Sequence, residues 1–172
     1  MRTLSALLLT LGVAQAQGPL FKAGLGGGSG FGGTLGLGVE AEWNRIALLG
    51  GVGSGDVDVS WDAGARYYFR VPGARIRPHA SVLYGPTHFV EYEIAGGSEP
   101  GKYTALIYGL NVLGGIDHDF RRPGGFMMSY GLGLAVPGNL PSEDVDRIEA
   151  VGGSPPEPNP ALALSIGIKY QF

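Results

Sequence analysis

The sequence contains no cysteine, which excludes a disulfide framework, a thiolate nucleophile and a cysteine-based metal site. Charged residues are also sparse, at 16 % of the chain, and 12 lysines and arginines nearly balance 15 aspartates and glutamates. This balance gives no reason to expect nucleic acid or another polyanion as a partner. After the first 17 residues, no apolar run approaches the ~20 residues that a transmembrane helix requires.

The N-terminal segment has the three parts of a secretory signal. Arg2 supplies a positive start, residues 4–13 are apolar, and Ala14-Gln15-Ala16 matches the A-x-A cleavage pattern. We therefore predict a cleaved signal peptide over residues 1–16 and one mature domain over residues 17–172. An exported domain without a transmembrane helix is either soluble or a membrane-spanning β-barrel.

The chain is rich in glycine, and its apolar and polar residues alternate regularly. Glycine accounts for 32 of 172 residues, well above its usual share of ~7 %. The C-terminal stretch 161–172 alternates strictly: even positions from Leu162 to Phe172 are apolar or aromatic, and odd positions are small or polar. A period of two predicts a β-strand with one apolar and one polar face. Its length matches a tilted strand that crosses a bilayer.

Similar alternation predicts about eight strands. They cover residues 18–26, 34–43, 46–53, 57–70, 75–85, 106–120, 126–136 and 161–172. The connections alternate between long (26–33, 54–56, 86–102, 137–160) and short (44–45, 71–74, 121–125). An even number of strands with short turns at one end is typical of outer-membrane barrels. An open sheet would leave unpaired backbone groups in hydrocarbon, so the sheet must close.

We therefore predict an all-β fold: a closed, up-and-down, antiparallel transmembrane barrel with short periplasmic turns, longer outer loops and both mature termini in the periplasm. Strand 46–53 is the least regular, because Leu49 interrupts its alternation. Pro78 lacks an N–H, so we expect a local irregularity there. Residues 87–94 and 102–105 are expected to extend one hairpin beyond the membrane.

Aromatic residues support the membrane interpretation independently. Six of them lie on the apolar faces at strand ends beside short turns or termini, where a periplasmic aromatic girdle is expected. These six are Phe21, Trp43, Phe69, Phe120, Phe126 and Phe172. A looser outer girdle is expected from Tyr84, Phe89, Tyr103 and Tyr108. The core of a soluble sandwich would not confine its aromatics to one end.

These features together resemble a known family. The A-x-A signal, about eight alternating strands and the terminal Tyr170-Gln171-Phe172 are similar to the small outer-membrane barrels of the OmpA, OmpX and OmpW type. In the last strand, Ile168, Tyr170 and Phe172 resemble the signal read by the barrel-assembly machinery. The resemblance implies a monomer in the bacterial outer membrane, surrounded by outer-membrane lipid, with that machinery as its partner during biogenesis. It indicates architecture and says little about activity.

The polar faces place many charges inside the predicted barrel. The expected lumen network comprises Lys22, Glu40, Glu42, Asp58, Asp62, Arg66, Arg70, Arg75, Arg77, His79, Asp117, Asp119 and Lys169. An eight-stranded barrel is only just wide enough for side chains, and ions without water must pair. We predict an ionic plug in which Lys169 pairs with Glu40, Glu42, Asp117 or Asp119, while inward glycines make room for long side chains. A narrow gated ion pathway is the alternative.

Catalytic and metal sites are not expected. His79 and Ser81 are neighbours on one face, and such a pair serves nucleophilic catalysis if a third group orients the base. They point into the lumen, however, away from lipid. The last loop carries clustered carboxylates between residues 141 and 158, but their spacing matches no EF-hand. We therefore predict no catalytic residue, no metal and no cofactor, and a short helix over residues 143–150 capped by Ser142.

The leading functional prediction is a structural or surface-interaction role through the outer loops 86–102 and 137–160. A small-solute or ion channel is the second hypothesis, and a lipid-modifying enzyme is the third. A soluble lipocalin-like barrel is the remaining alternative for the fold.

Overall fold

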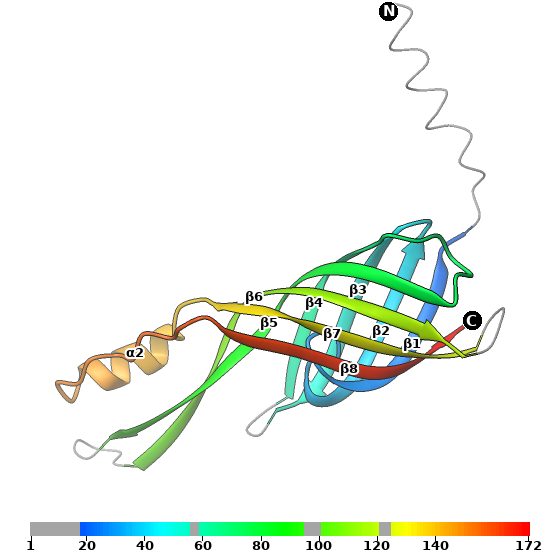
Figure 1. The fold of residues 1–172 in the computed structure, drawn as a ribbon. Helices are drawn as coiled ribbons and strands as arrows, with labels where there is room; N and C mark the ends of the chain where they lie inside the picture. Colours follow the sequence, from blue (N-terminus) through cyan, green and yellow to red (C-terminus); the bar gives the residue numbers. More distant parts are fainter. Residues whose placement is uncertain (1–17, 56–58, 95–100, 121–124) are drawn as a thin grey trace, which may run out of the picture.

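The computed structural model describes residues 18–55, 59–94, 101–120 and 125–172, so the predicted signal peptide lies outside the described residues. Within these ranges the chain forms eight strands and one helix, α2 (Figure 1). The strands are β1 (Leu20–Gly28), β2 (Gly33–Trp43), β3 (Ile46–Ser54), β4 (Val59–Tyr68), β5 (Ile76–Ile94), β6 (Gly101–Asp119), β7 (Phe126–Pro137) and β8 (Ala161–Gln171). Each strand pairs antiparallel with its neighbour in sequence, and β1 pairs with β8 to close the barrel. The predicted eight-stranded, closed, up-and-down barrel is confirmed.

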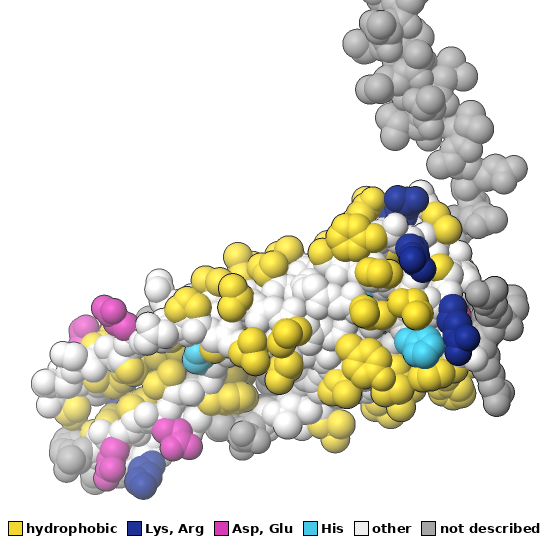
Figure 2. Space-filling view, viewed as in Figure 1, with side chains coloured by type: hydrophobic (Ala, Val, Ile, Leu, Met, Phe, Trp, Pro, Cys, Tyr) yellow, Lys and Arg dark blue, Asp and Glu magenta, His cyan; other side chains and the backbone are white. Residues whose placement is uncertain are grey.

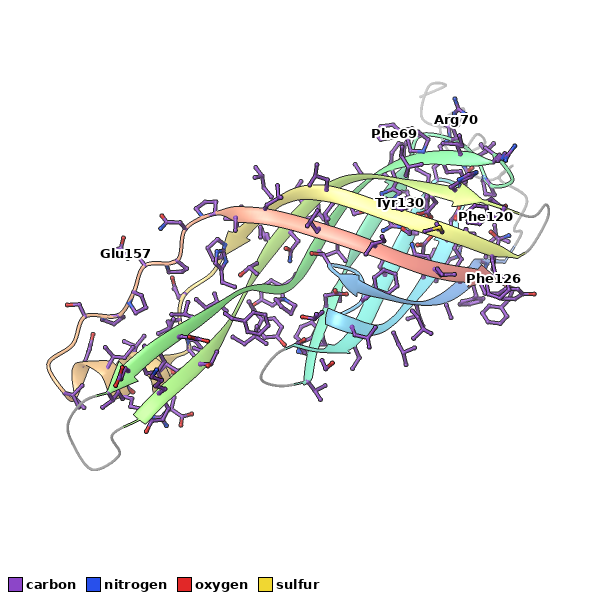
Figure 3. All side chains as sticks on the ribbon, turned by 60° about the horizontal axis from the view of Figure 1, so that its bottom comes forward. Phe69, Arg70, Phe120, Phe126, Tyr130 and Glu157 are labelled. Atoms are coloured by element: carbon purple, nitrogen blue, oxygen red, sulfur yellow. The ribbon has the colours of Figure 1, made fainter. Side chains whose placement is uncertain are left out.

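The alternation of each strand sorts its side chains between the lumen and the outer surface. In β8, Leu162, Leu164 and Ile166 are more than half exposed on the outside, whereas Ala163 and Lys169 are buried inside. Apolar side chains consequently cover much of the barrel's outer surface (Figure 2). All six residues predicted for the aromatic girdle are exposed on that surface. Figure 3 labels Phe69, Phe120 and Phe126 at the same end of the barrel.

Strands β5 and β6 are each 19 residues long and extend well past the other strands (Figure 1). β4 pairs with β5 only over residues 79–84, and β7 pairs with β6 only over residues 109–119. The remaining parts, residues 86–94 and 101–108, pair with each other alone. The hairpin therefore continues past the rest of the barrel over residues 86–94 and 101–108, and both strands are longer than predicted.

The irregularity expected at Pro78 lies elsewhere in β5. Pro78 pairs with Ile116 in an unbroken register, and the register shifts only between Pro86 and His88. The carbonyl of Pro78 accepts a hydrogen bond from the Phe69 N–H at 3.0 Å. In an antiparallel pair the nitrogen and carbonyl of one residue face the same side, so the Pro78 nitrogen faces Phe69, one residue past the end of β4. A proline at the end of a ladder is tolerated for this reason.

Helix α2 (Ser142–Glu149) packs against the extended hairpin. Its Ile148 and the preceding Leu140 contact Ala105 and Ile107 of β6 in a small apolar cluster. We call the paired extensions 86–94 and 101–108, together with α2, the outer module. The helix was expected over 143–150 with Ser142 as its cap; instead Pro141 occupies the cap position, and no side chain caps the helix. None of the described helical residues belongs to a helix long and apolar enough to cross a membrane.

Candidate functional site: a filled lumen

Charged side chains from β1, β2, β4, β5, β6 and β8 form a buried cluster inside the barrel. It combines four cations with three carboxylates, and none of these residues is more than 6 % exposed. The cations are Lys22, Arg66, Arg77 and Lys169, and the carboxylates are Glu40, Glu42 and Asp117. Charges without water are tolerated only when they pair. We call these seven residues the ionic layer.

Ion pairs link the ionic layer across strands far apart in sequence. Glu40 contacts Lys22 and lies 3.0 Å from Lys169 Nζ and 3.2 Å from Arg66 Nη1. The structure thus brings Lys169 together with Glu40, one of its four expected partners. Glu42 Oε2 lies 2.7 Å from Lys22 Nζ, and the two Glu42 carboxylate oxygens accept a bidentate hydrogen bond from the Arg77 guanidinium. Forked contacts of this kind fix an arginine in one orientation.

Tyr68 lies at the centre of the ionic layer and is fully buried. Its hydroxyl oxygen lies 2.6 Å from carboxylate oxygens of both Glu40 and Asp117, and it accepts a hydrogen bond from Lys22 Nζ at 2.9 Å. The Arg77 guanidinium carbon lies 3.8 Å from the ring centre, within cation–π range. Tyr68 is absent from the predicted network, although its position on the inward face of β4 was the available signal.

Several residues predicted for the network lie elsewhere. Arg70 and Arg75 are exposed, because β4 ends at Tyr68 and β5 begins at Ile76, so the alternation does not continue to these positions. Their assignment to the lumen is therefore wrong. Asp119 is half-buried at the end of β6, where its backbone N–H donates to the Arg75 carbonyl at 2.8 Å. Asp58 lies outside the described residues.

Asp62 is buried but binds backbone groups instead of the ionic layer. Its Oδ2 accepts hydrogen bonds from the N–H groups of Gly30 and Gly32 at 2.6 and 2.9 Å. Ser60 Oγ donates to the Gly32 carbonyl on the same segment. These contacts hold the turn between β1 and β2, residues 29–32, against the inner wall of the barrel. We call this turn the plug loop.

Phe31 of the plug loop inserts into the lumen and is only 1 % exposed. The wall around it is made of glycine: a Cβ added at Gly167 would lie 2.1 Å from Phe31 Cζ, and one at Gly38 would lie 3.0 Å from its Cδ1. A Cβ at Gly36 would lie 1.8 Å from the Phe31 carbonyl oxygen. These glycines were expected to make room for long charged side chains. The inserted phenylalanine uses that room instead, while Gly24 does serve Lys169, whose Cγ would lie 2.9 Å from an added Cβ.

An apolar layer also crosses the lumen. Leu49, Leu83, Leu113, Ala135 and Ala163 pack together, each less than 8 % exposed. Leu49, which interrupts the apparent alternation of its strand, is therefore an inward residue of this layer. Together with Phe31, these side chains form a buried apolar layer at a second cross-section of the barrel.

His79, Ser81 and Asp117 form an arrangement reminiscent of a catalytic triad. His79 Nδ1 lies 3.4 Å from Ser81 Oγ, and Nε2 lies 3.4 Å from Asp117 Oδ1 without hydrogen-bond geometry. All three residues are at most 3 % exposed. Ser81 Oγ accepts a hydrogen bond from Arg66 Nε at 2.9 Å, which occupies a lone pair that the nucleophile would use. The predicted inward orientation of His79 and Ser81 is confirmed, and both side chains are buried.

The outer module has a polar contact in addition to its apolar cluster. The Tyr92 hydroxyl donates to Asp144 of α2, and Arg147 lies 4.8 Å from the Tyr103 ring centre. Tyr92 and Tyr103 stack with their centroids 5.5 Å apart. Partial desolvation and the hydrogen bond to Asp144 raise the pKa of Tyr92 above its usual value. Among the described residues, no three His, Asp or Glu side chains are arranged to hold a metal ion.

No protein-family model matches this chain, and no curated protein sequence gives a significant match to it. A comparison of structures finds the crystal structure of the N-terminal β-barrel domain of Pseudomonas aeruginosa OprF, with a TM-score of 0.50 and 14 % sequence identity. The alignment covers 91 % of this chain and 98 % of that domain. At this identity the similarity establishes a shared fold, an OmpA-like eight-stranded barrel.

Proposed function

We propose that the chain is an integral protein of the bacterial outer membrane with a non-conducting barrel that carries the outer module at the cell surface. Three observations support the membrane placement. The outer surface of the barrel is apolar, six exposed aromatic residues lie at strand ends beside the short turns and the termini, and the fold matches that of an OprF barrel domain. Exposed apolar surface on this scale is stable in lipid and unfavourable in water.

The filled lumen supports the second part of the proposal, that the barrel does not conduct ions. A permeant ion would have to displace Phe31 and then cross the ionic layer, where Glu40 alone contacts three cations. Breaking one buried pair without replacing its partner costs ~3–5 kcal/mol. The barrel therefore serves as an anchor, and the His79–Ser81 pair that a lipid-modifying enzyme would use is buried inside it.

The outer module is the part of the chain that is suited to contact a partner. It extends past the end of every other strand and has its own apolar cluster of Ala105, Ile107, Leu140 and Ile148. A structured extension presents a fixed surface, which lowers the entropy lost on binding. We therefore assign the protein a structural or surface-interaction role rather than transport.

Cysteine accessibility tests this placement directly, because the chain has no cysteine of its own. Glu149→Cys on α2 and Arg45→Cys in the β2–β3 turn are both exposed sites at opposite ends of the molecule. A membrane-impermeant maleimide should label Glu149→Cys in intact cells and label Arg45→Cys only after the outer membrane is permeabilised. The reverse pattern, or equal labelling of both sites in intact cells, would contradict the proposed orientation.

A further inference from the structure

The barrel wall has a free strand edge in its outer part. β1 pairs with β8 only from Lys22↔Gln171 to Gly28↔Ser165. β8 continues outward as residues 161–164, still paired with β7 but no longer with β1 (Figure 1). One backbone hydrogen bond, from Ser29 N–H to the Leu164 carbonyl at 3.1 Å, lies at the point where the two strands part. Beyond it, residues 162–164 of β8 lie around one recess with Ser29, Gly33 and Thr34, across an interrupted seam.

A recess of about 180 Å³ lies at this interrupted seam. It touches Leu162, Ala163 and Leu164 in succession. Neighbouring residues of a strand point to opposite faces, and here Ala163 is buried inside while the two leucines are 66 % and 60 % exposed outside. The recess therefore passes around the free edge of β8 and connects the outer surface of the barrel with the outer end of its lumen.

The recess is blind at its inner end. Ala135 and Ala163 line it, and both also belong to the apolar layer that crosses the lumen. A molecule entering from the side thus meets this layer and cannot continue toward the ionic layer. Such a recess holds a bound group and does not serve as a passage.

The lining of the recess favours an apolar occupant. Of its four polar side chains, Asn111 Nδ2 donates to the Pro86 carbonyl at 3.2 Å and Thr87 Oγ1 donates to the Ile107 carbonyl at 2.9 Å. The other two, Ser29 and Thr34, line the recess on the side of β1 and β2. Phe89 and the two leucines supply apolar surface. The volume is below the ~300–1,000 Å³ of sites for drug-sized ligands, which favours a single slender chain.

We propose that this seam recess binds the end of one acyl chain of a membrane lipid, inserted laterally around the edge of β8. The inference rests on the proposed membrane placement, because only then does the mouth between Leu162 and Leu164 open into hydrocarbon. The inserted chain fills the cavity beside the apolar layer and shields the free backbone edge of β8. The lipid binds without any covalent bond being formed or broken.

A single-cysteine quenching experiment tests the proposal in vesicles that contain phosphatidylcholine with a nitroxide on its acyl chain. Ser29→Cys carries a small fluorophore at the recess, and Val52→Cys carries it on the outward face of β3, which is 57 % exposed. Both fluorophores should be quenched. Filling the recess with Ala163→Trp should lower quenching at position 29 at least twofold, and Ala161→Trp, on the same face of β8 but outside the recess lining, should leave it unchanged.

Each outcome has a distinct meaning. Quenching at position 52 without quenching at position 29 contradicts the seam site but leaves the membrane placement intact. Absence of quenching at both positions contradicts the membrane placement itself. Quenching at position 29 that persists in the filled variant shows contact with bulk lipid and also refutes the site. If Ala163→Trp fails to give the heat-dependent electrophoretic mobility of a folded barrel, Ala163→Leu, which adds less volume, replaces it.

Discussion

Replacing Glu40 by glutamine is the sharpest perturbation of the ionic layer. The Glu40 side chain is 3 % exposed and contacts Lys22, Arg66 and Lys169. Glu40→Gln keeps the shape but removes the charge, which leaves four buried cations facing two carboxylates. An uncompensated buried charge costs ~3–5 kcal/mol. With a urea dependence of about 2 kcal/mol per molar, the unfolding midpoint of the barrel in vesicles should fall by about 2 M.

Two further variants separate charge imbalance from a general loss of packing. Glu91→Gln changes an exposed carboxylate on the outer module and should alter the free energy of unfolding by no more than about 0.5 kcal/mol. Glu40→Gln combined with Lys169→Met removes one charge of each sign, and apolar replacement of a buried pair is often nearly neutral. The double variant should therefore regain most of the lost stability. If the single Glu40→Gln variant had the same urea midpoint of unfolding as the Glu91→Gln control, the reasoning would be refuted.

Two other predictions concern the plug loop and the outer module. Gly167→Ala places a Cβ 2.1 Å from Phe31 Cζ, so it should lower the free energy of unfolding by about 1–3 kcal/mol. Gly114→Ala is the control, because its Cβ would have no atom within 4 Å and should leave the free energy of unfolding unchanged. Equal urea midpoints for the two variants would contradict the insertion of Phe31. The raised pKa of Tyr92 means that its protonated phenol is favoured when α2 is docked. Docking should therefore be strongest below about pH 10, the ordinary tyrosine value, and weaken as the pH rises above it. A spin label on a cysteine introduced into α2 should become mobile above that pH, and Tyr92→Phe, which loses the bond to Asp144, should abolish the transition; a transition that persists in Tyr92→Phe would assign it to another group.

Strand positions and the direction of most side chains could be predicted from sequence because a period of two follows from backbone geometry. The ionic layer was largely predictable for the same reason: Lys22, Glu40, Arg66, Asp117 and Lys169 all lie within regular strands. The pattern carries information only as far as the strand extends. Extrapolation past the end of β4 and before the start of β5 placed two exposed arginines inside the barrel.

The plug loop could not be predicted from alternation. A glycine-rich turn has no periodicity, and the inward direction of Phe31 is set by Asp62 and Ser60, some thirty residues later in the chain. The available signal was the excess of inward glycines on β2 and β8, which implies that something bulky approaches the wall. Sequence alone does not say whether that group is a charged side chain or an inserted loop. The interrupted seam was equally hidden, because it depends on the register between β1 and β8.

Planar-bilayer conductance tests the central claim most directly, that the barrel spans the membrane with a filled lumen. The protein is inserted into a lipid bilayer, and its folded state in the same lipid is verified by heat-dependent electrophoretic mobility. The ionic layer and the inserted Phe31 predict no stepwise increase in current above that of the protein-free bilayer. Stable, repeated unit currents from the folded wild-type protein would contradict the filled lumen and identify the barrel as a channel.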